Sequence, residues 1–199
     1  QLHNVGKRFN KDWIFKSLDY TFTWGHHYVI LGKNGSGKST LLQCIAGFTN
    51  PSAGKIEFEN HTADMIFKSI SIAAPYLELI EEMTANEQID FHKKFKGLLG
   101  QISNETLLEK TGLKDASTKE IRNFSSGMKQ RLKLGLAFFS DCPILLLDEP
   151  CSNLDKEGQQ IYLDFVDAVK HEKFIIVASN DPIEYQFCHH QIDIMQYKF

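Results

Sequence analysis

The chain has 199 residues, enough for one domain of ordinary size or for a core with an inserted subdomain. Its hydrophobic share of 42% and charged share of 24% are ordinary for a globular protein, and a net charge of −3 gives no global electrostatic case for binding nucleic acid. No apolar run approaches the roughly eighteen residues that cross a bilayer, and no signal peptide is visible, so we expect another chain to supply any membrane-spanning helices.

The cysteines show no paired spacing. Their positions are Cys44, Cys142, Cys151 and Cys188. We interpret them as reduced, mostly structural thiols of a cytosolic protein. The run Cys188-His189-His190 could also suggest a metal site. Adjacent residues point apart on a strand or a helix, so the start of a C-terminal strand explains this run better.

The first 75 residues have the alternating pattern of β-strands, interrupted by one helix. The expected elements are strands over 2–5, 17–22 and 28–31, a helix over 41–46, a turn-rich connector over 47–54, and strands over 55–59 and 69–74. Strict alternation over 55–59 predicts an antiparallel strand with one face in solvent, whereas the apolar run 28–31 predicts a buried strand.

The middle of the chain changes to a helical period, and strands return after residue 140. Helices are expected over about 84–112, broken at Gly97 and Gly100, and over about 125–139. The remaining elements are a strand over 143–148, a helix over 156–170, and strands over 174–178 and 191–197. The pattern is therefore α/β, with a helical insertion between two parallel-strand segments.

The stretch from Gly32 to Thr40 fits the phosphate-binding pattern G-x-x-x-x-G-K-[ST]. It lies between a predicted strand and a predicted helix, a context that favours a phosphate site over a Gly-Ser turn with an exposed lysine. Its glycines let consecutive N–H groups curl around a phosphate. Lys38, which we also count as catalytic, can reach the β- and γ-phosphate oxygens, while Ser39 offers a hydroxyl to Mg²⁺. The residues predicted to bind nucleotide here are Gly32, Asn34, Gly35, Ser36, Gly37, Lys38, Ser39 and Thr40.

Two carboxylates follow a run of aliphatic residues. Asp148 and Glu149 stand at the C-terminal end of the predicted strand 143–148, where ligands bind in open α/β sheets. Asp148 can hold Mg²⁺ opposite Ser39, and Glu149 can deprotonate the water that attacks the γ-phosphate. Helix N-capping before Pro150 is the structural alternative, but it explains one carboxylate and not the pair.

With these residues the chain resembles the ATP-binding cassette (ABC) ATPases over essentially its whole length. Phe124–Arg131 resembles the signature motif, whose usual form is L-S-G-G-Q followed by a basic helix. Ile144–Glu149 resembles the Walker B strand, and Ser152–Asp155 resembles the D-loop. The resemblance implies a RecA-like P-loop NTPase core with an antiparallel β subdomain and an inserted α-helical subdomain, all in one domain. The expected division gives 1–75 and 140–199 to the core and β subdomain, and 76–139 to the helical subdomain with the signature motif.

The resemblance also implies roles for residues outside the loop. In the family two cassettes sandwich two ATP molecules, and the phosphate loop of one faces the signature motif of the other. Ser125 and Gly127 are therefore expected to contact the γ-phosphate held by the partner, although Ser125 could also serve as a helix N-cap. Phe9 is expected to stack on adenine, with Trp13 as its rival and a partly buried core position as the alternative. Asp155, in the D-loop, is expected to take part in catalysis.

Four positions depart from the family pattern. Tyr76 stands where the Q-loop glutamine is expected, and Asn180 stands in place of the switch histidine. Asn180 can still hydrogen-bond the γ-phosphate, so we keep it as a catalytic residue beside Glu149, but it carries no titratable proton. Within the signature motif, Ser126 replaces the first glycine and Met128 replaces the glutamine. The binding residues are complete while the hydrolytic ones are altered, which predicts slow basal turnover.

The segment 76–87 is where the family receives a short helix from a membrane subunit. Here it combines apolar residues with Glu78, Glu81, Glu82 and Glu87. It is either an apolar socket with an acidic rim, which would select a basic partner helix, or a loop with a solvated acidic face.

The resemblance as a whole predicts an ATP hydrolase that binds ATP and Mg²⁺. Its expected partners are a second cassette and a separate transmembrane transporter subunit, which would place it on the cytoplasmic face of a membrane; no nucleic-acid partner is expected. One alternative is a non-transport ABC ATPase acting on ribosomes or nucleic acid. The insertion is too short for the coiled coils of DNA-repair members, and ribosome-associated members usually carry two cassettes. The other alternative is a P-loop small-molecule kinase, which would have no use for the signature motif.

Overall fold

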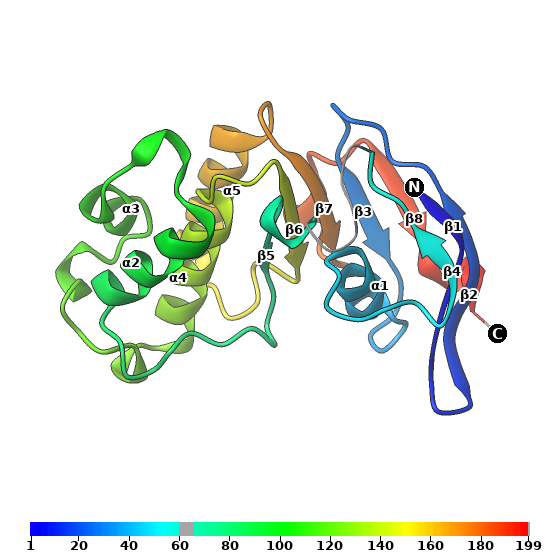
Figure 1. Cartoon of the computed structure of the whole chain (residues 1–199). Helices are drawn as coiled ribbons and strands as arrows, with labels where there is room; N and C mark the ends of the chain where they lie inside the picture. The colour runs from blue at the N-terminus through cyan, green and yellow to red at the C-terminus, as the bar shows by residue number, and fades with distance from the viewer. Residues whose placement is uncertain (60–65, 199) are drawn as a thin grey trace.

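The structure, a computed structural model, describes residues 1–59 and 66–198, and its centre is a five-stranded parallel sheet (Figure 1). The strand order is β5-β6-β7-β3-β8, with bounds Ile70–Ala73 (β5), Ile144–Asp148 (β6), Phe174–Ala178 (β7), Tyr28–Leu31 (β3) and His190–Asp193 (β8). Neighbouring strands in this sheet are all parallel. Parallel strands are joined by connections that cover both faces of a sheet, which explains the unbroken apolar run at the centre of β6.

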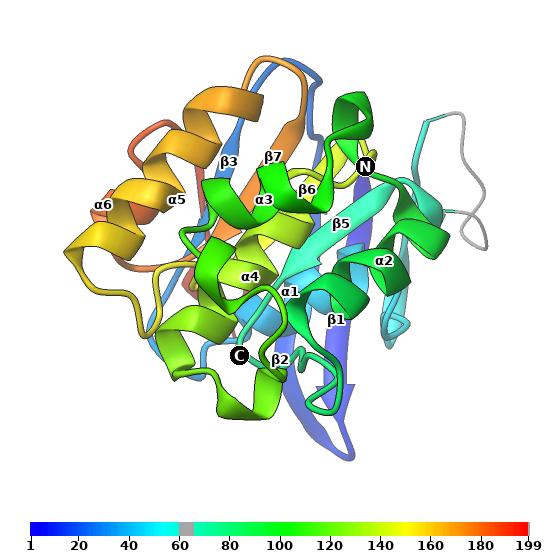
Figure 2. The same ribbon diagram turned by 90° about the vertical axis from the view of Figure 1, so that its left-hand side faces the viewer.

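Alternate residues of these strands point into two different hydrophobic clusters. Leu145 and Leu147 of β6 pack with the helices on one face, whereas Leu146 between them packs on the opposite face. The helices of the first face are α2 (Ala85–Lys96), α3 (Asn104–Lys110), α4 (Ser126–Phe138) and α5 (Lys156–Val169). Figure 2, seen from this side, shows these helices in front of the parallel strands.

The opposite face packs against helix α1 and a second sheet. This sheet is antiparallel, with order β2-β1-β4 and bounds Leu2–Phe9 (β1), Asp12–Tyr20 (β2) and Ala53–Ile56 (β4). Helix α1 (Lys38–Ile45) lies between the two sheets and contributes Leu41, Leu42 and Ile45 to the shared core. The phosphate loop is therefore held on a helix that is packed on both sides.

The structure confirms several predicted elements and their breaks. Strands are observed over 28–31 and 174–178, as the sequence predicts. The helical stretch divides at Gly97 and Gly100, and both have positive φ values, which glycine adopts readily. The further short elements are helix α6 (Pro182–Tyr185) and 3₁₀ turns over Ile66–Lys68, Leu99–Gln101, Lys114–Ala116, Ile121–Asn123 and Ile194–Tyr197.

Other predicted boundaries are wrong. The strand predicted over 55–59 is β4, which begins at residue 53 and ends at residue 56. Its Gly54 passes so close to β1 that a Cβ would lie 2.2 Å from the carbonyl oxygen of His3. The last strand ends at Asp193, whose side chain accepts a hydrogen bond from Met195 N–H and starts a 3₁₀ turn. The helix predicted from residue 41 begins at Lys38, and the strand predicted over 17–22 is β2.

The predicted division into subdomains stays a prediction, because one hydrophobic cluster runs across it. Helix α4 packs against α2 and α3 on one side and against α5 and β5 on the other. In the described part of the chain, no helix combines the length and apolarity needed to cross a bilayer. The four cysteines are unpaired, and His190 opens β8. Among residues 1–59 and 66–198, no three His, Cys, Asp or Glu side chains are grouped so as to hold a metal.

Candidate nucleotide-binding site

The phosphate loop connects β3 to α1 through a left-handed turn. Gly37 precedes the helix with a φ of 105°, and a Cβ there would lie 2.4 Å from the Ile14 side chain, so glycine is required on two grounds. Gly35 also has a positive φ, of 73°, but a Cβ there would meet nothing within 4 Å. The loop is thus closed on the side of β2 and open at its tip, where Asn34 is exposed.

Lys38 lies inside this loop. Its side chain is 5% exposed, and its ammonium donates a hydrogen bond to the carbonyl of Gly32 at 2.7 Å. The Ser36 hydroxyl is buried as well, and it has no hydrogen-bond partner among the described residues. A buried hydroxyl without a partner is costly unless a ligand supplies one. The phosphate loop therefore contains a buried hydroxyl that is available to hydrogen-bond a ligand.

Asp148 ends β6 beside the loop and is 1% exposed. Both of its carboxylate oxygens are buried without a hydrogen-bond partner in the described part of the chain. Burial raises the pKa of this carboxyl, and the neighbouring Ser39 hydroxyl and Lys38 ammonium only partly offset the rise. Unsatisfied carboxylate oxygens next to a hydroxyl are the donor set that Mg²⁺ prefers, so these residues fit the ion.

Glu149 follows directly and has an unusual backbone. Its φ is 44°, a region that residues other than glycine seldom adopt, and its N–H donates to the carbonyl of Ala178 on β7 at 3.0 Å. Its side chain is half-buried. The strained turn follows the end of β6, and the charge of Glu149 lies close enough to Asp148 to contribute to the raised pKa of that carboxyl.

Asn180 reaches the phosphate loop from the end of β7. Its Oδ1 accepts a hydrogen bond from Gly32 N–H at 3.3 Å, and its Nδ2 donates to Asn34 Oδ1 at 3.4 Å. The structure therefore brings Asn180 together with the loop, as the resemblance implied. Its amide spans the two sides of the loop opening.

Tyr76 follows β5 and its side chain lies near Asp148. Burial is the main reason that the pKa of Tyr76 rises to about 12, with the Asp148 charge adding to the rise. The side chain of Gln43 on α1 lies beside the Tyr76 hydroxyl and partly offsets this rise in its pKa. Sequence reasoning missed Gln43. Its spacing was the available signal, because a residue four positions after Ser39 lies on the same face of a helix.

The signature residues form a separate groove of about 260 Å³. It is lined by Ser125, Ser126, Gly127, Met128, Arg131, Asn153, Leu154 and Asp155. Ser125 caps α4 by accepting a hydrogen bond from Met128 N–H, and Asp155 caps α5 by accepting one from Gly158 N–H. The lining includes no phosphate-loop residue, so within one chain the two predicted halves of the nucleotide site are not brought together.

The structure distinguishes the two aromatic candidates for adenine stacking. Phe9 ends β1 and is 51% exposed, with the Lys7 ammonium over one face of its ring. Trp13 is half-buried and lies between the charged groups of Arg8 and Lys16. Phe9 has the freer face.

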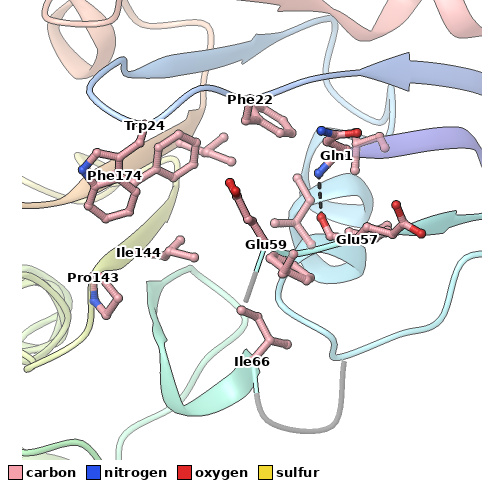
Figure 3. A pocket seen from close by; sticks show the side chains of 14 residues that line it. Gln1, Phe22, Trp24, Glu57, Glu59, Ile66, Pro143, Ile144 and Phe174 are labelled. Carbon is pink, nitrogen blue, oxygen red and sulfur yellow. Dashed lines mark hydrogen bonds between the residues drawn. The ribbon is translucent and has the colours of Figure 1, made fainter. Parts of the chain in front are cut away.

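A larger cavity, of about 720 Å³, lies elsewhere, at the edge of the sheet where β6 and β7 begin (Figure 3). Trp24 and Phe174 stack in its wall, and the amino group of Gln1 donates a hydrogen bond to the carbonyl of Glu57. Its lining contains none of the predicted nucleotide residues. Ligands of open parallel sheets bind at the opposite, carboxyl edge, so volume alone does not identify the functional site here.

Two buried side chains near the carboxyl edge were also missed. Gln130 of α4 donates a hydrogen bond to the carbonyl of Pro150 at 2.7 Å, and Glu184 of α6 accepts one from Cys151 N–H at 2.6 Å. Both bonds hold the backbone that follows Glu149. No local pattern marks either residue, because their partners are 20 and 33 positions away in sequence.

Comparison with known proteins decides the family. The sequence profile of the ABC transporter family matches residues 15–152. The chain belongs to this family. The match includes the phosphate loop, the signature motif and both carboxylates of β6, and the resemblance drawn from the sequence is confirmed.

Full-length relatives support the same assignment for this cassette. The chain is 29% identical over 195 residues to the uncharacterized ABC transporter ATP-binding protein YybJ of Bacillus subtilis, with 96% of this chain and 86% of the relative covered. It is 32% identical to ABC transporter I family member 1 of Arabidopsis thaliana, with 92% and 82% covered. It is 31% identical to the energy-coupling factor transporter ATP-binding protein EcfA1 of Thermotoga maritima, with 92% and 73% covered.

Solved structures confirm the fold of the cassette. A putative ABC transporter ATP-binding protein from Pyrococcus furiosus superposes with a TM-score of 0.84 at 18% identity, covering 100% of this chain and 98% of that one. The cassette MJ0796, solved as a dimer bound to ADP and Pi, gives a TM-score of 0.81 at 22% identity, with 97% and 94% covered. The predicted α/β class with a RecA-like core, an antiparallel sheet and added helices is therefore confirmed.

The buried Asp148 carboxylate gives a pH-dependent prediction for the nucleotide-free protein. Folding raises the pKa of Asp148 above its ordinary value of 3.8. At pH values between the unfolded and the folded pKa, the native state therefore binds more protons than the unfolded state. The free energy of unfolding should then fall as the pH rises from about 4. The total fall should be about 1.4 kcal/mol for each unit by which folding raises the pKa of Asp148. Asp148→Asn should remove this component and be more stable than wild type at pH 7. Chemical denaturation of both proteins from pH 4 to 8 measures the difference, and a difference that does not vary with pH would contradict the assignment.

Proposed function

We propose that this cassette binds ATP with Mg²⁺, dimerises around it and hydrolyses it to ADP and phosphate. The observation that carries the proposal is the meeting of Lys38, Asp148 and Asn180 at one edge of the sheet, each with unused or exchangeable hydrogen-bonding capacity. Glu149 lies at the same edge, next to Asp148. The family match supports nucleotide binding, and the related cassette MJ0796 was solved with ADP and Pi bound.

In this proposal the binding step rearranges the loop. Lys38 exchanges the carbonyl of Gly32 for β- and γ-phosphate oxygens, and the loop N–H groups and the Ser36 hydroxyl donate to the phosphates. Ser39 and Asp148 would hold Mg²⁺, whose charge stabilises the negative phosphate oxygens when it is bound. Phe9 offers its exposed ring face to the adenine.

Glu149 carries the chemical step. It accepts a proton from a water whose oxygen bonds to the γ-phosphorus while the bond from that phosphorus to the bridging oxygen of ADP breaks. The Asn180 amide donates to the γ-phosphate without exchanging a proton. The strained φ of Glu149 holds its carboxylate in one orientation for this task.

The separate signature groove supports a dimer. Ser125 and Gly127 lie at the N-terminus of a 13-residue helix, where N–H groups and the helix dipole attract an anion. They share the groove with Asp155 and with no phosphate-loop residue of their own chain. A second cassette, turned to face the first, would complete both sites.

Glu149→Gln should trap this dimer. The amide keeps the size of the side chain but cannot take a proton, so hydrolysis should fall by about a hundredfold or more while ATP binding persists. Light scattering in saturating Mg-ATP should show a dimer for the variant, and a monomer without nucleotide. The matched control carries Ser125→Arg in the same background, which fills the signature groove. A Glu149→Gln protein that stays monomeric in Mg-ATP would remove the sandwich arrangement.

Asn180→His tests the altered switch position. Histidine would restore the ring found there in the family and should raise turnover on the order of tenfold, because a single well-placed transition-state group is worth about a hundredfold in rate. Phosphate release at saturating ATP measures the change, with Asn180→Ala as the variant expected to lose activity. Fast turnover of the wild-type protein, with no increase in the histidine variant, would show that another group already stabilises the transition state.

We further propose that the cassette energises transport through a separate membrane subunit, on the cytoplasmic face of the membrane. The named relatives above are transporter ATP-binding proteins, which supports this setting. The structure changes the docking hypothesis for segment 76–87, because Leu79 and Met83 pack inward on the core and Glu81 pairs with Lys129 of α4. Ile80 remains 36% exposed and would give a partner helix an apolar contact, while the Lys129 pair neutralises part of the acidic rim.

Replacing Ile80 tests this docking. Ile80→Lys should reduce co-purification with a membrane subunit from detergent extracts at least tenfold, since a charge in an apolar contact is desolvated without a partner. ATP binding should not change. Phe48→Lys, at another exposed apolar residue, is the matched control. Recovery of ribosomal proteins in place of a membrane protein would favour the non-transport alternative, and undiminished capture by Ile80→Lys would refute this site.

A further inference from the structure

Glu184 is a buried carboxylate that the nucleotide site does not yet explain. It lies on α6 and is 3% exposed, and burial raises the pKa of its carboxyl. Despite the cost of burying such a group, its carboxylate lies between residues from two different parts of the chain. The N–H of Cys151 donates a hydrogen bond to it at 2.6 Å, and the hydroxyl of Ser179 lies beside it and partly offsets the rise in its pKa.

These two neighbours of Glu184 belong to the two loops that carry the catalytic candidates. Cys151 stands two residues after Glu149, on the turn that leaves β6. Ser179 stands immediately before Asn180, and its hydroxyl oxygen also accepts a hydrogen bond from Asp181 N–H at 2.9 Å. Glu184 therefore connects the two loops directly.

The turn at Glu149 needs such support. A positive φ at a residue with a side chain is unfavourable and persists only where the surroundings hold it. Four hydrogen bonds hold the backbone here. Glu149 N–H donates to Ala178, Ser152 N–H donates to Glu149, Gln130 donates to the Pro150 carbonyl, and Cys151 N–H donates to Glu184. The Cys151–Glu184 bond extends this support from β7 to α6, on the far side of the loop that bears Asn180.

We propose that Glu184 is a positioning residue, which holds Glu149 and Asn180 in a fixed relative arrangement through the turn at Cys151 and the hydroxyl of Ser179. The expected effect on turnover rests on the proposed hydrolysis. The link between the two loops does not depend on that proposal. The proposal differs from a purely structural role because it predicts a loss of turnover out of proportion to the loss of stability.

Tyr162 supplies the matched control. Its buried hydroxyl donates a hydrogen bond to the backbone carbonyl of Glu184 at 2.5 Å and does not involve the carboxylate. Tyr162→Phe removes a buried hydrogen bond from the same cluster and leaves both loop contacts in place. It should lower the melting temperature and leave turnover within twofold of wild type.

Glu184→Ala and Glu184→Gln test the carboxylate. The alanine variant should lose at least tenfold in kcat with a smaller change in KM for ATP, because Lys38 and the N–H groups of the phosphate loop are not themselves altered. The glutamine variant keeps an acceptor for Cys151 N–H and should stay within threefold of wild type. If Glu184→Ala does not fold, Ser179→Ala cuts one arm of the link without a large cavity and should lower kcat several-fold.

Amide hydrogen exchange without nucleotide tests the link independently of hydrolysis. Glu184→Ala, or Ser179→Ala in its place, should speed exchange in peptides covering both 149–155 and 179–183, whereas Tyr162→Phe should not. Unchanged exchange in either loop overturns the inference, even if wild type proves to hydrolyse ATP. Equal kcat for Glu184→Ala and Tyr162→Phe, or equal losses for alanine and glutamine at position 184, would also overturn it. Faster exchange in a chain whose wild type releases no phosphate would uphold the link while refuting the proposed hydrolysis.

Discussion

Parallel pairing of β6, β7 and β3 is the constraint on which the candidate site depends. The register pairs Asp148 with Ala178 across β6 and β7, and Ala178 with Ile30 across β7 and β3. Three strands from distant parts of the chain therefore end together, and the residues that follow them meet at one edge. This geometry brings the phosphate loop, the two carboxylates and Asn180 to one edge of the sheet, although the loop lies more than a hundred positions before the other three residues.

The same edge leaves polar groups unsatisfied. Asp148 and Ser36 are buried without partners among the described residues, and Lys38 donates to the carbonyls of Gly32 and Lys33 in its own loop. Such groups weaken the ligand-free fold and favour a charged ligand that can satisfy them, which is the usual compromise at a functional site. The left-handed backbone at Glu149 adds strain at the same place, and the surrounding hydrogen bonds maintain it.

Much of this arrangement could be predicted from sequence because it depends on local patterns. Gly32–Thr40 is a contiguous motif between a strand and a helix, and Asp148 and Glu149 end an aliphatic run. Glu184 could not be found this way, because its partner Cys151 is 33 positions away and only the packing of α6 brings them together. The bounds of β4 depend on the close approach of Gly54 to β1, a contact between strands that no single-strand pattern encodes.

The central claim is that one chain holds two half-sites and that catalysis needs two chains. The most direct measurement is the rate of phosphate release per chain at saturating Mg-ATP, followed as the protein concentration increases. If two cassettes must combine, the rate per chain should rise with concentration and level off once dimers dominate, because dimer formation follows mass action. A rate per chain that is constant down to the lowest measurable concentration, with light scattering showing monomers throughout, would contradict the account.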